Sequence, residues 1–158
     1  MSKQEVMVSE QGEPQYQKDN VIGYEVTVLS KNFLALYFFI QNKLVRARYA
    51  LDVEHTNKND FIYEYEEIKK TLTTKYGPPT SDNTLWANDS YKDDRSRWGF
   101  AISLGYLAFS STWETEETEI LNYVSGENLR VYCVIEYISK KLIHLEEQQQ
   151  HKKNMEAF

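Results

Sequence analysis

Residues 33–40 read FLALYFFI, and this run of eight apolar residues decides the fold. The run is far shorter than the ~20 residues that span a bilayer. Apolar side chains at every position are typical of a strand that is covered on both faces. The flanking segments 24–29 and 45–51 alternate between apolar and polar residues, and clusters of turn-forming residues separate them from the run. The sequence therefore predicts three consecutive antiparallel strands joined by short turns.

A helix is predicted to follow these strands. Apolar side chains recur three or four residues apart, which places them on one stripe of an α-helix, at Phe61, Tyr65, Ile68, Leu72 and Tyr76. Asn59 or Asp60 can cap the start of this helix, and Gly77 followed by two prolines ends it.

The second half of the chain repeats the pattern of strands closed by a helix. Residues 78–97 read as a long polar connection, after which strands are predicted at 98–104, 107–113, 118–124 and 129–138, with a helix from Ser139. Grouped strands with segregated helices indicate an α+β fold. We therefore expect a curved antiparallel sheet of about seven strands, in the order βββ-α-ββββ-α, with the helices packed on one face.

The length of 158 residues suits one domain. We expect a flexible leader over 1–20, a single α+β domain over 21–145 and a polar helical tail over 146–158. The N-terminal residues have no apolar core of the kind found in signal peptides. The chain as given is expected to be soluble, and is either cytoplasmic or the mature part of an exported bacterial protein.

Charge and cysteine content exclude several classes of protein. A net charge of −6 argues against binding to a nucleic-acid backbone. The single cysteine, Cys133, excludes an intramolecular disulfide and multi-cysteine metal sites. Cys133 alternates with apolar residues on its strand, so we interpret it as a small buried side chain and not as a reactive thiolate.

Three clusters of acidic or histidine residues do not match the catalytic or metal-binding motifs that they suggest. The four glutamates between Glu114 and Glu119 form a turn in which no carboxyl group has the apolar pocket that raises the pKa of a catalytic acid. The aspartates between Asp89 and Asp94 miss the calcium-loop pattern at three positions. His144 and His151 are seven residues apart, which is too far for one zinc ion. We therefore predict no catalytic, cofactor-binding or metal-binding residues and no cofactor.

The aromatic and small residues suggest a binding surface instead. The strand 33–40 is apolar on both faces, yet two helices can cover only one face of the sheet. A neighbouring strand has one face of small residues, which leaves room for something to pack against it. The predicted interaction surface consists of Arg46, Arg48, Trp86, Tyr91, Ser110 and Thr112. Alternatively, Arg46 and Arg48 pair across strands with acids such as Glu119 or Glu136.

A set of packing and turn residues resembles a type of small bacterial domain. The set comprises Leu44–Tyr49, Tyr65, Ile68–Lys70, Leu72, Lys75–Gly77, Pro79, Trp86, Trp98–Gly99, Trp113, Thr115 and Ile135–Tyr137. This type is found mainly in Gram-positive organisms, is often exported or lipid-anchored and has no assigned activity. The chain departs from it by lacking a lipobox cysteine and a leader. The resemblance implies no catalytic residues.

The function that these observations favour is a non-enzymatic interaction domain. It would bind a protein or peptide, or a second copy of itself, through the exposed sheet face and the 78–97 loop, without nucleic acid and without membrane insertion. One alternative is a small hydrolase-like enzyme whose site is assembled from residues distant in sequence. Another is a carrier of a small hydrophobic ligand, which needs a closed apolar cavity of ~300–1,000 Å³ between helix and sheet.

Overall fold

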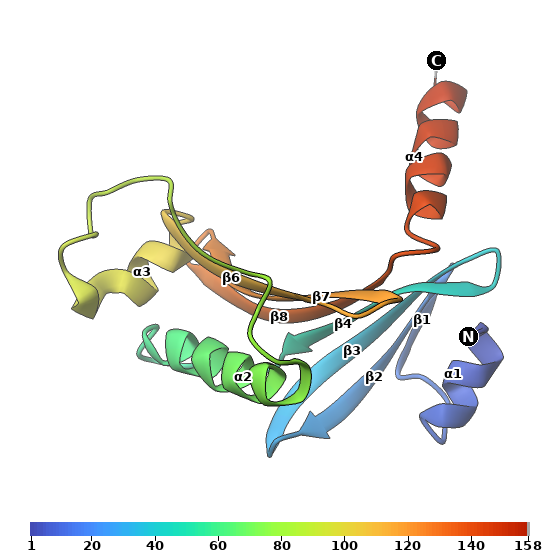
Figure 1. Cartoon of the computed structure of the whole chain (residues 1–158), viewed down its shortest axis with the longest axis horizontal. Helices are drawn as coiled ribbons and strands as arrows, with labels where there is room; N and C mark the ends of the chain where they lie inside the picture. Colours follow the sequence, from blue (N-terminus) through green and yellow to red (C-terminus); the bar gives the residue numbers. More distant parts are fainter. Residues whose placement is uncertain (158) are drawn as a thin grey trace.

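A computed structural model describes residues 1–157 as one antiparallel sheet with four α-helices (Figure 1). The eight strands are β1 (Tyr16–Lys18), β2 (Val21–Val28), β3 (Lys31–Ile40), β4 (Lys43–Leu51), β5 (Ser81–Trp86), β6 (Leu107–Glu114), β7 (Thr118–Glu127) and β8 (Arg130–Ser139). Their order in the sheet is β1-β2-β3-β4-β8-β7-β6-β5. The predicted α+β class and the curved antiparallel sheet are confirmed, with eight strands where about seven were expected.

The sheet consists of two four-stranded meanders that meet where β4 pairs with β8. In this central ladder Ala47 lies opposite Tyr137, and Tyr49 lies opposite Ile135. Helix α1 (Lys3–Ser9) precedes the first meander, and helix α2 (Asp60–Tyr76) precedes the second. Each half of the described chain therefore begins with a helix and supplies four neighbouring strands, although in the second half α3 lies between β5 and β6 and α4 follows β8.

Three of the helices lie on the same face of the sheet, which we call the helix face. In Figure 1, α1 and α2 lie below the strands, while α4 (His144–Glu156) rises on the opposite side. Helix α3 (Trp98–Ser103) follows a short 3₁₀ turn (Arg95–Arg97) and packs with α2 in one apolar cluster. None of the helices in residues 1–157 combines the length and the apolar character needed to cross a bilayer.

Helix α2 forms where the sequence predicts it. Its apolar stripe is buried against the sheet, and Gly77 ends it with a φ of 85°, a left-handed conformation that glycine adopts without strain. The side chain of Asn59 does not cap the helix. Instead, Asn59 Oδ1 accepts a hydrogen bond from the Gly99 N–H at 2.6 Å, which joins the start of α2 to α3.

The N-terminal segment, predicted as a flexible leader, contains α1 and β1. Ser2 and Glu5 form a reciprocal capping box, in which each side chain accepts a hydrogen bond from the other's backbone N–H. Val6 is only 2% exposed and packs against Ile22, Tyr37 and their apolar neighbours. Helix α1 thus supplies the cover of the first meander.

Three segments differ from their predicted structure. Residues 98–104, predicted as a strand, form α3, and the predicted loop 78–97 contains the edge strand β5. A Cβ atom on Gly99 would lie 2.2 Å from the Lys58 carbonyl carbon, so this glycine permits a close backbone approach that sequence alone does not show. The C-terminal helix starts at His144 and not at Ser139, and Phe158, the last residue of the predicted tail, lies outside the described residues.

Two apolar clusters support the two meanders. The first lies under β2 to β4 and includes Val6, Ile22 and Phe39. The second lies between α2, α3 and strands β6 to β8, and includes Trp113 and Cys133. Cys133 is a free, buried thiol, as predicted. Both clusters lie on the helix face, so the opposite face of the sheet has no comparable cover from α1, α2 or α3.

Candidate functional site

The side of the sheet opposite α1, α2 and α3 is the candidate site, and we call it the open face. Side chains alternate along each strand, so the strand register fixes which residues belong to it. The apolar residues near its centre come from β3, β7 and β8 and are Leu34, Leu36, Phe38, Leu121, Tyr123, Val134 and Ile138. Except for the buried Val134, these side chains are only half-buried in the described chain.

Two arginines and a glutamate occupy the centre of the open face. Arg48 lies opposite Glu136 in the β4–β8 ladder, and its Nε donates to Glu136 Oε1 at 2.6 Å. Arg46 Nη1 donates to the other oxygen, Oε2, at 3.0 Å. Glu136 is only 4% exposed because the two guanidinium groups cover it. Its negative charge is thereby neutralised on both oxygens, as a buried carboxylate requires.

Arg46 extends this network to the C-terminal helix. Its Nη2 and Nε donate to the two carboxylate oxygens of Glu146 at 2.7 and 3.2 Å, which is a bidentate contact. Burial lowers the pKa of the Arg46 guanidinium, but the hydrogen bonds and charges of Glu146 and Glu136 outweigh it and raise this pKa overall. The base of α4 is thus held over the open face by a fixed positive charge.

Arg48 is the more available of the two arginines. Its guanidinium lies 5.6 Å from the centre of the Phe38 ring, and its side chain is 36% exposed. Tyr123 lies on the same face. Burial and then the charge of Glu136 raise the pKa of this phenol, partly offset by Arg48 and Arg46. Tyr123 therefore keeps its hydroxyl proton at neutral pH and can both donate and accept hydrogen bonds.

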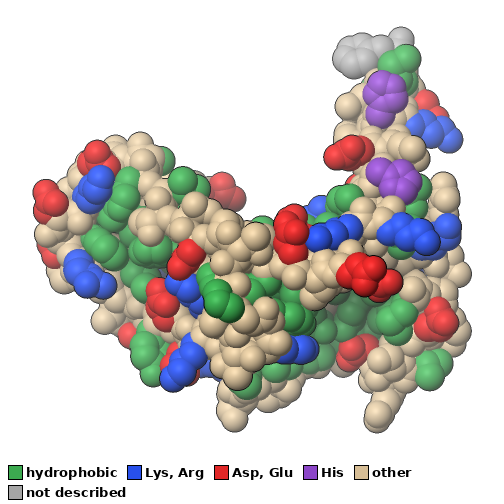
Figure 2. All heavy atoms as spheres, viewed as in Figure 1, with side chains coloured by type: hydrophobic (Ala, Val, Ile, Leu, Met, Phe, Trp, Pro, Cys, Tyr) green, Lys and Arg blue, Asp and Glu red, His purple; other side chains and the backbone are tan. Residues whose placement is uncertain are grey.

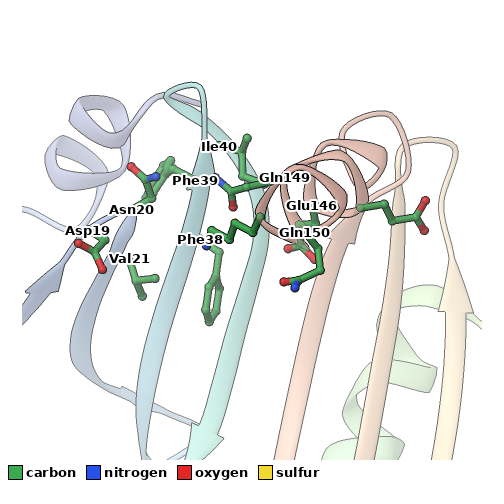
Figure 3. Close-up of a pocket in the computed structure, with 11 residues that line it drawn as sticks. Asp19, Asn20, Val21, Phe38, Phe39, Ile40, Glu146, Gln149 and Gln150 are labelled. Atoms are coloured by element: carbon green, nitrogen blue, oxygen red, sulfur yellow. The ribbon is translucent and has the colours of Figure 1, made fainter. Parts of the chain in front are cut away.

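The projecting α4 gives this side of the molecule its shape. Figure 2 shows the molecule hollowed along its top, between α4 and the opposite lobe. A groove of about 820 Å³ lies where α4 meets the strands. Figure 3 shows Asp19, Asn20 and Val21 on one side of it, Phe38 on β3, and Gln149 and Gln150 on α4.

Four of the six predicted surface residues lie on the open face. Arg46 and Arg48 are central, and Ser110 and Thr112 lie on β6, opposite Tyr123 and Leu121 of β7. The small side chains of β6 leave the neighbouring β7 residues accessible. The fold therefore brings this part of the prediction onto one continuous surface.

Trp86 and Tyr91 lie elsewhere. Trp86, at the end of β5, packs edge-on against Trp98 with ring centres 5.5 Å apart. Tyr91 stacks on Tyr106 at 6.3 Å and meets Phe100 edge-on at 5.6 Å. The polar connection is thus fixed by an aromatic cluster at one end of the molecule and does not extend the open face.

Polar groups on the helix face serve its packing. The Tyr65 hydroxyl lies 2.5 Å from Ser111 Oγ, and Ser111 donates to Asp82 Oδ1 at 2.9 Å. Asp82 also accepts a hydrogen bond from Lys69 at 2.6 Å. Although this series resembles a relay, Ser111 is fully buried, so no substrate can reach its hydroxyl. Within residues 1–157, no group of three or more metal-ligating side chains gathers at one point.

Sequence reasoning missed Glu146 as a member of the site. The sequence offers Glu136 as one of two acids that can pair with the arginines, and strand alternation is the signal that points to it. Glu146 carries no such signal, because its contact depends on where α4 leaves the sheet.

Comparisons with known proteins do not identify the chain. No family model matches it, no curated protein matches it, and no solved structure matches it. The resemblance to a small bacterial domain therefore stays a prediction.

Proposed function

We propose that this chain is a non-enzymatic interaction domain that binds a partner protein through the open face of its sheet. The observation that carries the proposal is the unequal cover of the two faces: α1, α2 and α3 all pack on one, and the other keeps half-buried Leu36, Phe38, Leu121 and Tyr123. Exposed apolar area of this kind, with polar groups in and around it, is characteristic of protein-binding surfaces.

The chemistry of the surface supports a partner of a particular kind. The apolar residues on both sides of the Arg46–Glu136–Arg48 network call for apolar side chains in the partner. Arg48 donates to Glu136 through Nε, and its Nη2 forms an ion pair with the same oxygen, whereas Nη1 makes no such contact in residues 1–157. A carboxylate or carbonyl oxygen of the partner can accept from this group at the centre of the interface. Arginine in such a position is a common source of binding energy.

The surface is hollowed, so the partner must protrude into it. The groove beside α4 adds amide and carboxylate groups at the rim, including Asn20, Gln149 and Glu147. We therefore expect a convex partner segment with an apolar centre and polar edges.

Photocrosslinking followed by titration tests the proposal. A photoreactive phenylalanine analogue replaces Leu121 on the open face in one variant and the exposed Tyr63 of α2 in a control variant. We expect a discrete crosslinked protein in cells of the source organism only from position 121. That protein is then purified and titrated against the chain by calorimetry.

The titration compares the effect on binding of a substitution on the open face with that of a substitution on α2. Leu121→Lys is expected to weaken binding at least about tenfold. Tyr63→Lys, which changes an exposed aromatic residue of α2, should leave binding within about twofold. Circular dichroism melting shows that both variants remain folded. The proposal fails if position 121 gives no discrete adduct, or if Tyr63→Lys weakens binding as much as Leu121→Lys does.

The pocket between α2 and the sheet does not support the carrier alternative. The pocket between α2 and the sheet, lined by Phe33, Tyr49, Ile68 and Tyr137 among others, has a volume of about 180 Å³. This is below the ~300 Å³ at which ligand cavities begin.

A further inference from the structure

The two edges of the sheet are built differently. Strand β1 has only three residues and carries Lys18, and both features discourage another strand from adding to it. Strand β5 has six residues, pairs with β6 without a register shift and contains no lysine, arginine or proline. It therefore lacks the usual protections of an exposed edge.

The free backbone groups of β5 can be assigned from its ladder. The Ala87 N–H donates to the Tyr106 carbonyl at 2.8 Å, next to the Trp86–Leu107 pair. Alternate residues of an antiparallel strand bond to the same neighbour. The odd-numbered residues of β5 therefore bond to β6, and Asp82, Thr84 and Trp86 direct their N–H and C=O groups away from the sheet.

The side chains of β5 do not oppose the approach of another strand. Its only charged residue is Asp82, whose carboxylate is neutralised within the chain by Lys69 and also accepts a hydrogen bond from Ser111. Trp86 is held against Trp98. By contrast, Leu85 is 62% exposed beside the free edge. The edge thus offers three pairs of backbone groups and an uncovered apolar side chain.

We propose that β5 pairs antiparallel with β5 of a second copy of this chain. A two-fold axis perpendicular to the sheet places identical faces on the same side, so residues opposite each other must belong to the same face. With the axis at Thr84, Thr84 lies opposite Thr84 of the partner subunit, and Asp82 lies opposite Trp86 of the partner subunit. All of these residues are among those with free backbone groups.

This register is favoured by charge and by apolar contact. Leu85 then lies diagonal to Leu85 of the partner subunit on the open-face side, within reach of a side-chain contact. An axis at Asp82 would set two carboxylates opposite each other, which is unfavourable. An axis at Asn83 avoids that repulsion but separates the two leucines. An axis at Leu85 also keeps the carboxylates apart and sets the two leucines directly opposite each other. The strand is therefore self-complementary about Thr84 and about Leu85, which favours a second copy over a foreign peptide.

The dimer would join two eight-stranded sheets into one continuous sheet. Both open faces would lie on the same side of it, so a partner with two copies of its binding segment would meet two sites. The dimer stands independently of the proposed function, because β5 is separate from the Arg46–Glu136–Arg48 network.

The test is the solution mass of the full chain and of variants at position 84. We expect light scattering after gel filtration to give twice the 18.7 kDa chain mass at concentrations up to about 0.5 mM. Thr84→Pro removes a backbone N–H that does not bond to β6, so the hydrogen bonds between β5 and β6 remain. The substitution removes only the donor that would bond to β5 of the second copy. The dimer dissociation constant should rise at least about tenfold. Thr84→Val keeps the N–H and should leave the dimer intact.

A second variant covers the case in which Thr84→Pro does not fold. Leu85→Asp replaces the diagonal leucine contact by two like charges, and it should also yield monomers. The proposal is overturned if the unmodified chain stays monomeric at every concentration. It is also overturned if folded Thr84→Pro or Leu85→Asp dimerises as tightly as the parent. A monomer that instead binds extended peptides at β5 would overturn it in favour of a foreign strand.

Discussion

The two faces of the sheet are made by the same strands, yet they differ in how much of their apolar surface is covered. On the helix face, Trp113, Ile120 and Val124 are almost wholly buried under α2 and its neighbours. On the open face, the residues between them, Leu121 and Tyr123 among others, are only half-buried, and the central charges pair with one another. The comparison shows that the helix face is closely packed and the open face is not, and this difference is the basis of the proposed binding surface.

The largest expected effect comes from truncating the helix face. Trp113→Ala removes a buried ring and its Nε1 hydrogen bond to the Gly77 carbonyl, and should lower the free energy of unfolding by about 3–5 kcal/mol. Leu121→Ala, on the adjacent strand but on the open face, should cost less than about 1.5 kcal/mol. Urea denaturation of both variants measures the difference, and equal losses would refute the distinction between the faces.

The second-largest effect is expected at alkaline pH, which should lower the free energy of unfolding through a buried group of the helix face. Burial first, and then the charge of Glu64, raise the pKa of Cys133 from 9.0 to about 12, partly offset by Lys31. The folded state therefore keeps a proton that the unfolded state loses, and the stabilisation present below pH 9 declines as pH rises toward 12. Between pH 8 and pH 10.5, the free energy of unfolding of the parent should fall by about 2 kcal/mol more than that of Cys133→Ala.

Urea unfolding at both pH values, in the presence of a reducing agent, measures this difference. Burial also raises the pKa of Tyr65, to about 12, but this group is present in both proteins and cancels in the comparison. If the free energy of unfolding falls equally with pH in the parent and in Cys133→Ala, the pH dependence does not come from Cys133.

A smaller effect is expected at the centre of the open face. Glu136→Gln keeps the shape of the side chain but removes the charge that Arg46 and Arg48 share. Because both arginines are partly solvated and Arg46 retains Glu146, we expect a loss of about 1–2 kcal/mol in the free energy of unfolding. The matched control is Glu119→Gln on the same face, which should change it by less than about 0.5 kcal/mol. The loss should shrink in 1 M salt, and a salt-independent loss would argue against an electrostatic origin.

The smallest effect is expected on β6. Thr112→Ala and Ser110→Ala alter small, half-buried side chains of the open face for which residues 1–157 show no hydrogen bond. Each should change the free energy of unfolding by less than about 0.5 kcal/mol. If thermal melting shows a larger loss, these residues serve the fold and are not free surface.

Local signals explain which elements could be predicted. Helix α2 follows from its apolar period and from Gly77, both of which act within a few residues. Helix α1 also has a local signal, since Ser2 and Glu5 have capping-box spacing, but the polar composition of residues 1–20 favours a flexible leader instead. By contrast, α3 depends on the approach of Gly99 to the backbone of Lys58 and Asn59, which are forty residues away in the chain.

Only the residues of the site that strand alternation places on one face could be predicted from the sequence. Alternation places Arg46 and Arg48 on one face and allows Glu136 as their partner. The positions of Trp86 and Tyr91 depend on the strand order, which puts β5 at the far edge of the sheet. The contact of Glu146 depends on the direction of α4. Neither the order nor the direction is encoded in short-range patterns.

The junction between β4 and β8 has a consequence for how the chain could be divided. Each meander follows its own helix, and the segment between Leu51 and α2 contributes no residue to the buried part of either apolar cluster. The two clusters share partly buried neighbours such as Tyr49 and Tyr137 at the junction. Cleavage near the exposed Val53 would separate two fragments that still present matching strand edges to each other. The molecule is therefore a natural candidate for a split reporter, in which reassembly of the two pieces restores the whole.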